Sequence, residues 1–336
     1  MSRAKVIVTD YLREPLKIEE KILGDLAEVT ALGATTEEEL LGSLADADAL
    51  LVYHFVSITE RIIKGLANCK IIVRCGVGHD NVDSAAARAR GIPVANVPDY
   101  GTEEVADSAL GMILSLTRGI HRLSVRIQDG TPPWSPEPAA PLHRLRGSTL
   151  GIVGLGRIGT ALALRAKTIG FEVVFHDPYL PAGREKATGA RRMESLEELL
   201  RQSQVVSLHC PGTEETENLI DEQAIDLMPD NAYLVNTARG SCVDCASILD
   251  ALAKGKLAGA ALDVLPGEPP DPEDPLLLAW RNPRHPAHER LLLNPHGAWY
   301  CEEGKEDARV KACNNVRRVL LGEEALNVVN EIPKET

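Results

Sequence analysis

Three polar residues in the second half of the sequence each follow an apolar segment that has the composition of a β-strand. They are Arg239, Glu268 and His296. Because arginine stays protonated, its planar guanidinium can bind a carboxylate and polarise a carbonyl beside it. Histidine titrates near neutral pH and can donate a proton, and a glutamate hydrogen-bonded to its ring favours the imidazolium. Together, these groups predict the proton-transfer chemistry needed to reduce a 2-oxo acid.

The stretch 150–177 predicts the cofactor that such a reaction needs. It reads LGIVGLGRIGTALALRAKTIGFEVVFHD, which is a strand, a glycine turn, a helix, a second strand and an acid. In this context Gly154 allows the tight turn, Gly156 allows close approach of a pyrophosphate, and Gly159 allows the helix to pack on the strand. Asp177 can accept hydrogen bonds from the adenosine ribose hydroxyls, and its charge opposes a 2′-phosphate. We therefore predict bound NAD rather than NADP.

Composition excludes several other classes of protein. The chain has 336 residues, a net charge of −13 and 44% hydrophobic residues. This acidic balance argues against a nucleic-acid-binding surface, and no apolar run approaches the length of a membrane span. Seven scattered cysteines and an N-terminus without a signal peptide favour a cytoplasmic protein. Cys242 and Cys245 form one CxxC, but no further ligands stand at matching spacing, so we expect no metal.

The first hundred residues alternate strand-like and helix-like segments. Strands are expected at 4–9, 28–32, 49–54 and 70–74, with helices between them. The alternation predicts an α/β fold with a small parallel sheet, whose ligand-facing loops lie at the carboxyl ends of the strands. Gly76 and Gly78 follow one of these strands.

A helical pattern then runs from 102 to 129, long enough as one helix to link two domains. Six strands are expected after it, beginning with the glycine turn, and they predict a complete doubly wound nucleotide-binding domain. A final helix is expected at 302–321. We therefore expect a discontinuous substrate-binding domain, 1–100 plus 300–336, an NAD-binding Rossmann domain at 101–299, and a cleft between the two doubly wound domains.

Several motifs carry a resemblance that covers nearly the whole chain. GLGRIG, NTARG, ALDV followed by GEP, and NPHGAWY resemble the D-2-hydroxyacid dehydrogenase family. LVYH, IIVRCGVGHDNVD, NVPDYGTEEVADSAL and FHDPYL are most similar to its C-terminal-binding-protein branch, the dehydrogenase-like corepressors. The resemblance implies that Arg239, Glu268 and His296 are catalytic and that Trp299 contacts a thioether-bearing 2-oxo acid.

It also implies two sets of binding residues. The cofactor would contact the fingerprint glycines and Asp177, together with Arg157, Ile158, Cys210, Pro211, Thr216, Thr237, Ala238, Arg239, Asp263 and His296. The substrate would contact His54, Arg74, Gly76, Val77, Arg239, His296 and Trp299.

Two features depart from the family pattern. The loop 266–290 is longer than the family usually has, so Glu268 is placed by motif only, with Glu273 and Glu289 as alternatives. The long tail of animal corepressors and any basic nuclear-targeting run are missing. We therefore expect a homodimeric enzyme acting on a small to medium 2-oxo or 2-hydroxy acid. The alternative is an NADH-responsive dimeric scaffold with vestigial activity.

Overall fold

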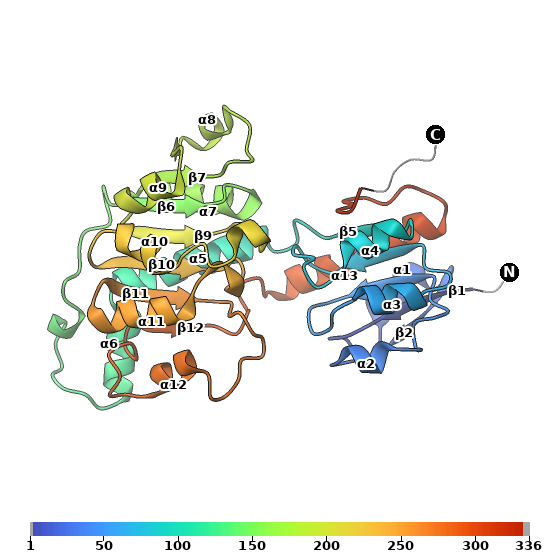
Figure 1. Ribbon diagram of the computed structural model, residues 1–336, viewed down its shortest axis with the longest axis horizontal. Coiled ribbons are helices and arrows are strands. Elements are labelled where there is room, and N and C mark those ends of the chain that lie inside the picture. The colour runs from blue at the N-terminus through green and yellow to red at the C-terminus, as the bar shows by residue number, and fades with distance from the viewer. Residues whose placement is uncertain (1–2, 332–336) are drawn as a thin grey trace. The chain divides into compact units, whose positions relative to one another are not determined.

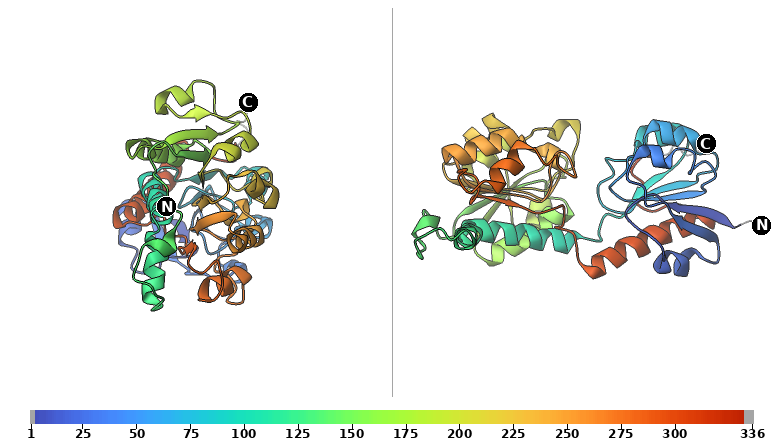
Figure 2. Two further views of the ribbon diagram at one scale, coloured as in Figure 1. Left: turned by 90° about the vertical axis from the view of Figure 1, so that its left-hand side faces the viewer. Right: turned by 90° about the horizontal axis from the view of Figure 1, so that it is seen from below.

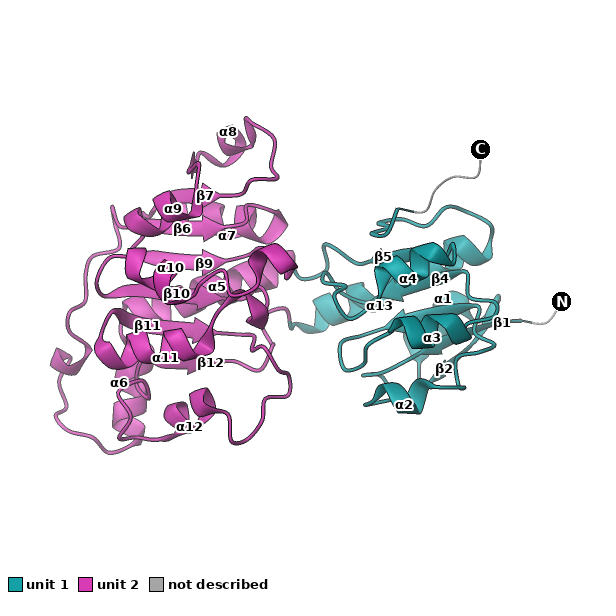
Figure 3. Ribbon diagram, viewed as in Figure 1, with its two compact units in different colours: residues 1–101, 300–336 teal, residues 102–299 magenta. Residues whose placement is uncertain are grey.

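The computed structural model describes residues 3–331 and divides into two compact units (Figure 3). Unit 1 comprises residues 1–101 and 300–336, and unit 2 comprises residues 102–299. Each unit contains one parallel sheet with helices on both faces, as Figures 1 and 2 show. This is the predicted α/β fold class with two parallel sheets.

The sheet of unit 1 has the order β2-β1-β3-β4-β5. Its central strands are buried on both faces, which explains why they read as continuous apolar runs rather than alternating ones. The strands are β1 (Ala4–Val8), β2 (Ala27–Ala31), β3 (Ala49–Val52), β4 (Ile71–Arg74) and β5 (Val94–Asn96). The helices are α1 (Lys17–Leu23), α2 (Glu37–Leu40), α3 (Glu60–Gly65), α4 (Ser84–Ala89) and α13 (Glu302–Leu320).

Helix α13 comes from the end of the chain and completes unit 1. It contributes Ala312, Cys313 and Val316 to the same buried cluster as Val6 and Val73 of the sheet. Its Arg309 donates two hydrogen bonds, of 2.7 and 2.6 Å, to the buried Glu19 carboxylate of α1. The chain therefore leaves this unit at Gly101 and returns to it at Tyr300.

Unit 2 has a seven-stranded sheet in the order β12-β11-β10-β9-β6-β7-β8. We predicted six strands; the seventh, β8, is a two-residue edge strand that no sequence pattern marked. The strands are β6 (Thr149–Val153), β7 (Glu172–His176), β8 (Arg191–Arg192), β9 (Val205–Leu208), β10 (Ala232–Asn236), β11 (Leu257–Leu262) and β12 (Leu291–Leu293). The order reverses between β6 and β9, and in such sheets ligands bind at the carboxyl ends of the strands beside that reversal.

The helices of unit 2 cover both faces of its sheet. They are α5 (Thr102–Thr117), α6 (Ile120–Gln128), α7 (Arg157–Thr168), α8 (Arg184–Thr188), α9 (Leu196–Gln202), α10 (Glu222–Leu227), α11 (Cys245–Lys254) and α12 (Pro275–Arg281). Short 3₁₀ turns lie at η1 (Glu137–Ala139), η2 (Glu214–Thr216) and η3 (Gly240–Cys242). Helix α12 lies within the long loop 266–290.

The predicted single helix over 102–129 is wrong. It breaks at Gly119, which adopts φ +65° and separates α5 from α6. A Cβ on Gly119 would lie 2.8 Å from the Cβ of Ala139, so the close approach of η1 also requires glycine here. The helical periodicity persists across the break, which is why the sequence pattern missed it.

Candidate active site

The glycine turn after β6 has the geometry that a dinucleotide phosphate needs. Gly154 has φ +89°, and a Cβ there would lie 2.9 Å from the backbone nitrogen of Cys210. A Cβ on Gly159 would lie 2.1 Å from the Gly154 carbonyl oxygen. A Cβ on Gly156 would meet no atom within 4 Å, so the space beside the first turn of α7 is open. Helix N–H groups there can bind an anion.

Asp177 ties the end of β7 to this turn. One carboxylate oxygen accepts a hydrogen bond from the Leu155 N–H at 2.9 Å, and the other accepts one from the Tyr179 N–H at 3.1 Å. The residues next to Asp177 include no arginine, but folding brings Arg192 of β8 close. Its guanidinium donates to the carbonyl oxygens of Asp177, Leu180 and Pro181. The guanidinium is therefore engaged in holding this loop.

A groove of about 760 Å³ lies over the carboxyl ends of β6, β7 and β9. It brings together five of the predicted cofactor residues, namely Gly154, Asp177, Cys210, Pro211 and Thr216. The other lining residues were not predicted from the sequence: Val153, His176, Pro178, Tyr179, Leu196, Thr213, Glu214, Glu215 and Leu219. The acidic Glu214 and Glu215 add negative charge beside Asp177. Their position shortly after β9, at the carboxyl edge of the sheet, was the sequence feature that could have predicted them as groove residues.

Two polar atoms at this sheet edge are buried and have no hydrogen-bond partner among residues 3–331. They are Thr237 Oγ1, just after β10, and His209 Nδ1, just after the neighbouring β9. Burial lowers the pKa of His209 to about 3, and its Nε2 lies 2.8 Å from Ser207 Oγ. An orphaned hydroxyl at the same sheet edge as the open glycine turn fits a polar ligand, and the residues present therefore fit NAD.

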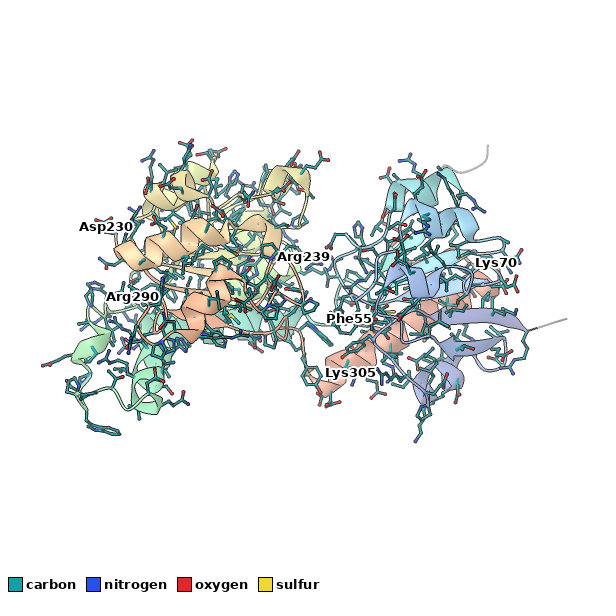
Figure 4. The ribbon with its side chains drawn as sticks, turned by 60° about the horizontal axis from the view of Figure 1, so that its bottom comes forward. Phe55, Lys70, Asp230, Arg239, Arg290 and Lys305 are labelled. Atoms are coloured by element: carbon teal, nitrogen blue, oxygen red, sulfur yellow. The ribbon has the colours of Figure 1, made fainter. Side chains whose placement is uncertain are left out.

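Arg239 follows β10 in unit 2 (Figure 4). The buried Asn236 shapes this turn, because its side chain donates to the Arg239 carbonyl at 2.8 Å and accepts from the Ala238 N–H at 2.9 Å. Arg239 Nη1 donates to the Ala238 carbonyl at 2.9 Å. A Cβ on Gly212 would lie 2.9 Å from Arg239 Cγ, so the glycine leaves room for the arginine stem.

His296 and Glu268 lie in direct contact. His296 Nδ1 is 2.6 Å from Glu268 Oε2, and the other carboxylate oxygen accepts a hydrogen bond from the Leu265 N–H at 2.8 Å. Burial raises the pKa of Glu268, but its hydrogen bonds and the charges of His296 and Arg239 outweigh burial and lower the pKa overall. The carboxyl group is therefore ionised at neutral pH.

The two alternative glutamates, Glu289 and Glu273, contact other residues. Glu289 forms ion pairs with Arg126 at 2.7 Å and with Arg122 at 3.4 Å. The backbone N–H of Glu273 donates to Asp271 at 2.9 Å, within the turn before α12. Of the three candidates, Glu268 is the one that contacts the imidazole.

Asp263 fixes the turn that carries His296. Its Oδ1 accepts hydrogen bonds from Asn294 Nδ2 at 2.5 Å, the Gly297 N–H at 2.9 Å and the Ala298 N–H at 3.0 Å. The His296 N–H donates to the Asp263 carbonyl at 2.7 Å, and His296 adopts φ +51°. Burial raises the pKa of Asp263 more than these hydrogen bonds lower it. The buried aspartate therefore holds the histidine in a left-handed conformation.

The predicted substrate residues of unit 1 lie at one sheet edge. Arg74 ends β4, and His54 lies two residues beyond β3, the neighbouring strand. A Cβ on Gly76 would lie 1.6 Å from Arg74 Nη1, so the glycine leaves room for the guanidinium in its present position. Val77 is exposed, and Trp299, the last residue of unit 2, is partly exposed.

The cysteines show neither a disulfide nor a metal cluster. Cys242 lies next to Cys210, with their sulfur atoms 3.9 Å apart. Within residues 3–331, no group of three or more His, Cys, Asp or Glu side chains is arranged to hold a metal ion. In the same range, no helix has both the length and the apolar character needed to cross a membrane.

A doubly wound domain with this glycine turn, and with an imidazole–carboxylate pair and an arginine after later strands, defines a nicotinamide-dependent dehydrogenase. Residues 110–298 match the family model of the D-isomer specific 2-hydroxyacid dehydrogenase NAD-binding domain. The chain belongs to this family. It is therefore an NAD-dependent oxidoreductase of the class that acts on CH–OH groups.

Individual relatives agree with this assignment. The chain is 36% identical over 333 residues to D-3-phosphoglycerate dehydrogenase of Methanocaldococcus jannaschii, covering 98% of this chain and 60% of that enzyme. It is 35% identical over 334 residues to glyoxylate reductase of Thermofilum pendens, covering 98% and 96%. D-lactate dehydrogenase of Aquifex aeolicus, complexed with NAD and lactic acid, is similar in structure. Its TM-score is 0.83 at 28% identity, with 95% and 96% of the two chains covered. The chain thus spans about three fifths of the length of the D-3-phosphoglycerate dehydrogenase.

Proposed function

We propose that this protein is an NAD-dependent D-2-hydroxyacid dehydrogenase that reduces small to medium 2-oxo acids. The observation that carries the proposal is the 2.6 Å contact between Glu268 and His296. The positive charge of Arg239 in the same unit also lowers the pKa of Glu268. A proton donor, its supporting anion and a cation are the groups that carbonyl reduction requires.

Bound NADH supplies the hydride. Arg239 binds the substrate carboxylate and polarises the 2-oxo group, because its guanidinium is always charged and bidentate. His296 donates a proton from Nε2 to the alkoxide oxygen while Nδ1–H remains hydrogen-bonded to Glu268. In the reverse direction, neutral His296 accepts that proton from the hydroxyl group.

Asp177 and the groove beside it favour NAD. A 2′-phosphate would lie against the Asp177 carboxylate and near Glu214 and Glu215, and the Arg192 guanidinium already donates to the carbonyl oxygens of this loop. Gly154, Gly156, Arg157, Ile158 and Gly159 would contact the pyrophosphate. Thr237, Ala238 and Asp263 would lie on the nicotinamide side, with the orphaned Thr237 hydroxyl supporting this placement.

Unit 1 would be the substrate-binding domain and unit 2 the NAD-binding domain. His54, Arg74, Gly76, Val77 and Trp299 would then contact the substrate. Support comes from the two glycine-bearing turns at the carboxyl ends of parallel strands, where ligands bind in such sheets.

A homodimer is also proposed. No residue of α6 is buried, and Ile120 and Ile127 are 60% and 55% exposed. Trp134, shortly after this helix, is 89% exposed. Exposed apolar surface of this kind favours a protein partner, for which a second copy is the simplest candidate. Sedimentation velocity of the wild type and of Trp134→Glu tests whether the protein is a homodimer and whether this surface forms the interface.

The test of the activity is a panel of 2-oxo acids assayed with NADH and NADPH. We expect NADH-dependent turnover of at least one of them, lost in His296→Gln. The second candidate function is the NADH-responsive scaffold of the C-terminal-binding-protein type, which the segments LVYH and NVPDYGTEEVADSAL support. NADH binding without turnover of any 2-oxo acid favours the scaffold. A cytoplasmic location is part of the enzyme proposal and is tested by cell fractionation.

A further inference from the structure

The carboxyl edge of the unit 1 sheet carries a cluster of aromatic rings, of which the proposed function uses only His54. Tyr11 follows β1, and Tyr53, His54 and Phe55 follow β3, the adjacent strand. The Tyr11 ring centroid lies 5.2 Å from that of Tyr53, 5.3 Å from His54 and 5.9 Å from Phe55. His54 and Phe55 are 4.4 Å apart. These spacings are those of packed aromatic pairs.

A buried carboxylate holds the loop that carries these rings. Asp10, directly before Tyr11, is completely buried. Its Oδ1 accepts hydrogen bonds from the Tyr53 N–H at 2.8 Å and the Thr9 hydroxyl at 2.7 Å, and its Oδ2 accepts one from the Phe55 N–H at 2.7 Å. A fully buried carboxylate is costly unless its oxygens are paired, so this arrangement fixes the backbone on both sides of His54.

An amide holds the same loop from the other side. Asn81 Nδ2 donates to the carbonyl oxygens of Tyr53 and Val56, both at 2.8 Å. The segment 53–56 thus has four of its backbone groups bound by two side chains. Such a loop presents its rings in one conformation.

The cluster has a buried part and an exposed part. Tyr53 is 6% exposed and packs in the core, whereas Phe55 is 52% exposed. Figure 4 labels Phe55. A phenyl ring that remains half exposed contributes little to folding, yet Asp10 and Asn81 hold its backbone. The loop is therefore more constrained than packing alone requires.

The neighbouring strand carries the proposed substrate residues. β4 pairs with β3 so that Arg74 lies opposite Val52, the last residue of β3. Arg74 and Gly76 therefore leave the sheet beside the segment that carries His54 and Phe55. A ligand at the turn 74–77 has the aromatic cluster as its lateral neighbour in this unit.

We propose that Tyr11 and Phe55 join His54 in a specificity surface for the substrate side chain, and that Asp10 positions this surface. The surface selects 2-oxo acids with an aryl group on C3, such as phenylpyruvate, because a ring can pack against these rings. This inference rests on the proposed function, and it adds three residues and a substrate class to it.

The test is the ratio of kcat/KM for phenylpyruvate to that for glyoxylate, measured with NADH. A favourable aromatic contact corresponds to a change of roughly two- to tenfold, so Phe55→Ala should lower the ratio about fivefold. Phe55→Tyr should keep the wild-type ratio. Leu321→Ala, which changes an equally exposed apolar residue of the same unit, is the matched control and should leave the ratio unchanged.

Tyr11 and Asp10 are tested in the same assay. Tyr11 has φ +67°, which glycine adopts readily, so Tyr11→Gly removes the ring without straining the backbone. It should lower the ratio severalfold, and Tyr11→Phe should restore it. Asp10→Asn turns an acceptor into a donor facing an N–H. It should raise KM for phenylpyruvate while the NADH dissociation constant, which reports on unit 2, stays the same.

The outcomes separate the two proposals. If the wild type turns over both substrates and the ratio is unchanged in both Phe55→Ala and Tyr11→Gly, the specificity surface is wrong and the proposed function stands. If the wild type turns over no 2-oxo acid, both are wrong. Equal losses for both substrates in Asp10→Asn, with weaker NADH binding, would make Asp10 a residue of the fold alone.

Discussion

Glu268 Oε2 lies 2.6 Å from His296 Nδ1, and the Leu265 N–H holds the other oxygen of the same carboxylate. The side chains are 33% and 30% exposed, so the pair is accessible to a ligand while much of it is shielded from water. Because Glu268 is acceptor-only when ionised, the shared proton belongs to Nδ1. In the proposed mechanism, Nε2 is the atom that exchanges a proton with substrate.

The first prediction concerns this pair. His296→Gln should lower kcat by roughly 10²–10⁴-fold, the usual contribution of a positioned acid. Glu268→Gln should retain more activity. It should also move the alkaline limit of 2-oxo acid reduction to lower pH, because the negative charge that favours the imidazolium is gone.

The matched control is Glu289→Gln, which removes a carboxylate from the Arg122 and Arg126 ion pairs instead. It should leave the pH limit where it is in the wild type. Steady-state rates between pH 5.5 and 9.5 measure all three variants. An unmoved limit in Glu268→Gln would assign the support of His296 to another group.

Some of this site was predictable from sequence, because its signals are local. The glycine turn, Asp177 and the three residues after strands occupy positions that strand periodicity and motif spacing define. Other relationships join residues far apart in the chain. Arg192 reaches the Asp177 carbonyl from β8, and Asp10 binds the loop at Phe55; no spacing rule predicts either contact.

The two errors in the predicted fold also have physical causes. The helix breaks at Gly119, which adopts φ +65° and has η1 packed against it, and the hydrophobic period on both sides still predicts one helix. β8 has two residues, too few for a period. The domain boundaries were predicted at 100 and 300, and the two compact units of the structure meet after Gly101 and after Trp299.

The second prediction concerns cofactor choice. NAD should bind at least roughly tenfold more tightly than NADP, a difference of about 1.4 kcal/mol, because the Asp177 carboxylate opposes the 2′-phosphate. Asp177→Ser should reduce the difference in affinity between NAD and NADP. Glu172→Gln, which removes a charge from the amino end of the same strand β7, should not. Fluorescence titration of both reduced cofactors gives the constants, and equal affinities in the wild type would contradict the assignment.

The third prediction concerns acid stability. His209 has a pKa of about 3 in the folded state because of burial, against about 6.5 in an unfolded chain. The unfolded state therefore binds a proton as pH falls below about 6.5 while the folded state does not, so stability is lost in that direction. Between pH 7 and pH 5 the loss is roughly 1–2 kcal/mol, allowing for partial solvent exposure of the residue.

Urea unfolding at the two pH values measures this loss. His209→Gln should lose less free energy of unfolding between pH 7 and pH 5 than the wild type does, whatever its stability at pH 7. The exposed His143→Gln is the control and should show the full wild-type loss. An identical loss in His209→Gln would mean that the buried histidine does not govern acid stability.

The last prediction concerns Trp299, three residues after His296 and partly exposed at the end of unit 2. If its indole contacts the substrate side chain, medium apolar 2-oxo acids should be better substrates than glyoxylate. Sulfur packs favourably at an aromatic edge, so 4-methylthio-2-oxobutyrate is a suitable test substrate. Burying two or three methylene-sized groups corresponds to roughly 2 kcal/mol, or about a thirtyfold higher kcat/KM than for glyoxylate.

Trp299→Ala should therefore lower the ratio of kcat/KM for 4-methylthio-2-oxobutyrate to that for glyoxylate by about thirtyfold, and Trp299→Phe should lower it less. The opposing explanation is that the indole serves folding, since tryptophan is mostly buried wherever it occurs. In that case Trp299→Ala should lose activity on both substrates equally and should melt at a lower temperature. The substrate ratio and the melting temperature, measured on the same preparations, distinguish a residue that selects substrate from one that only packs.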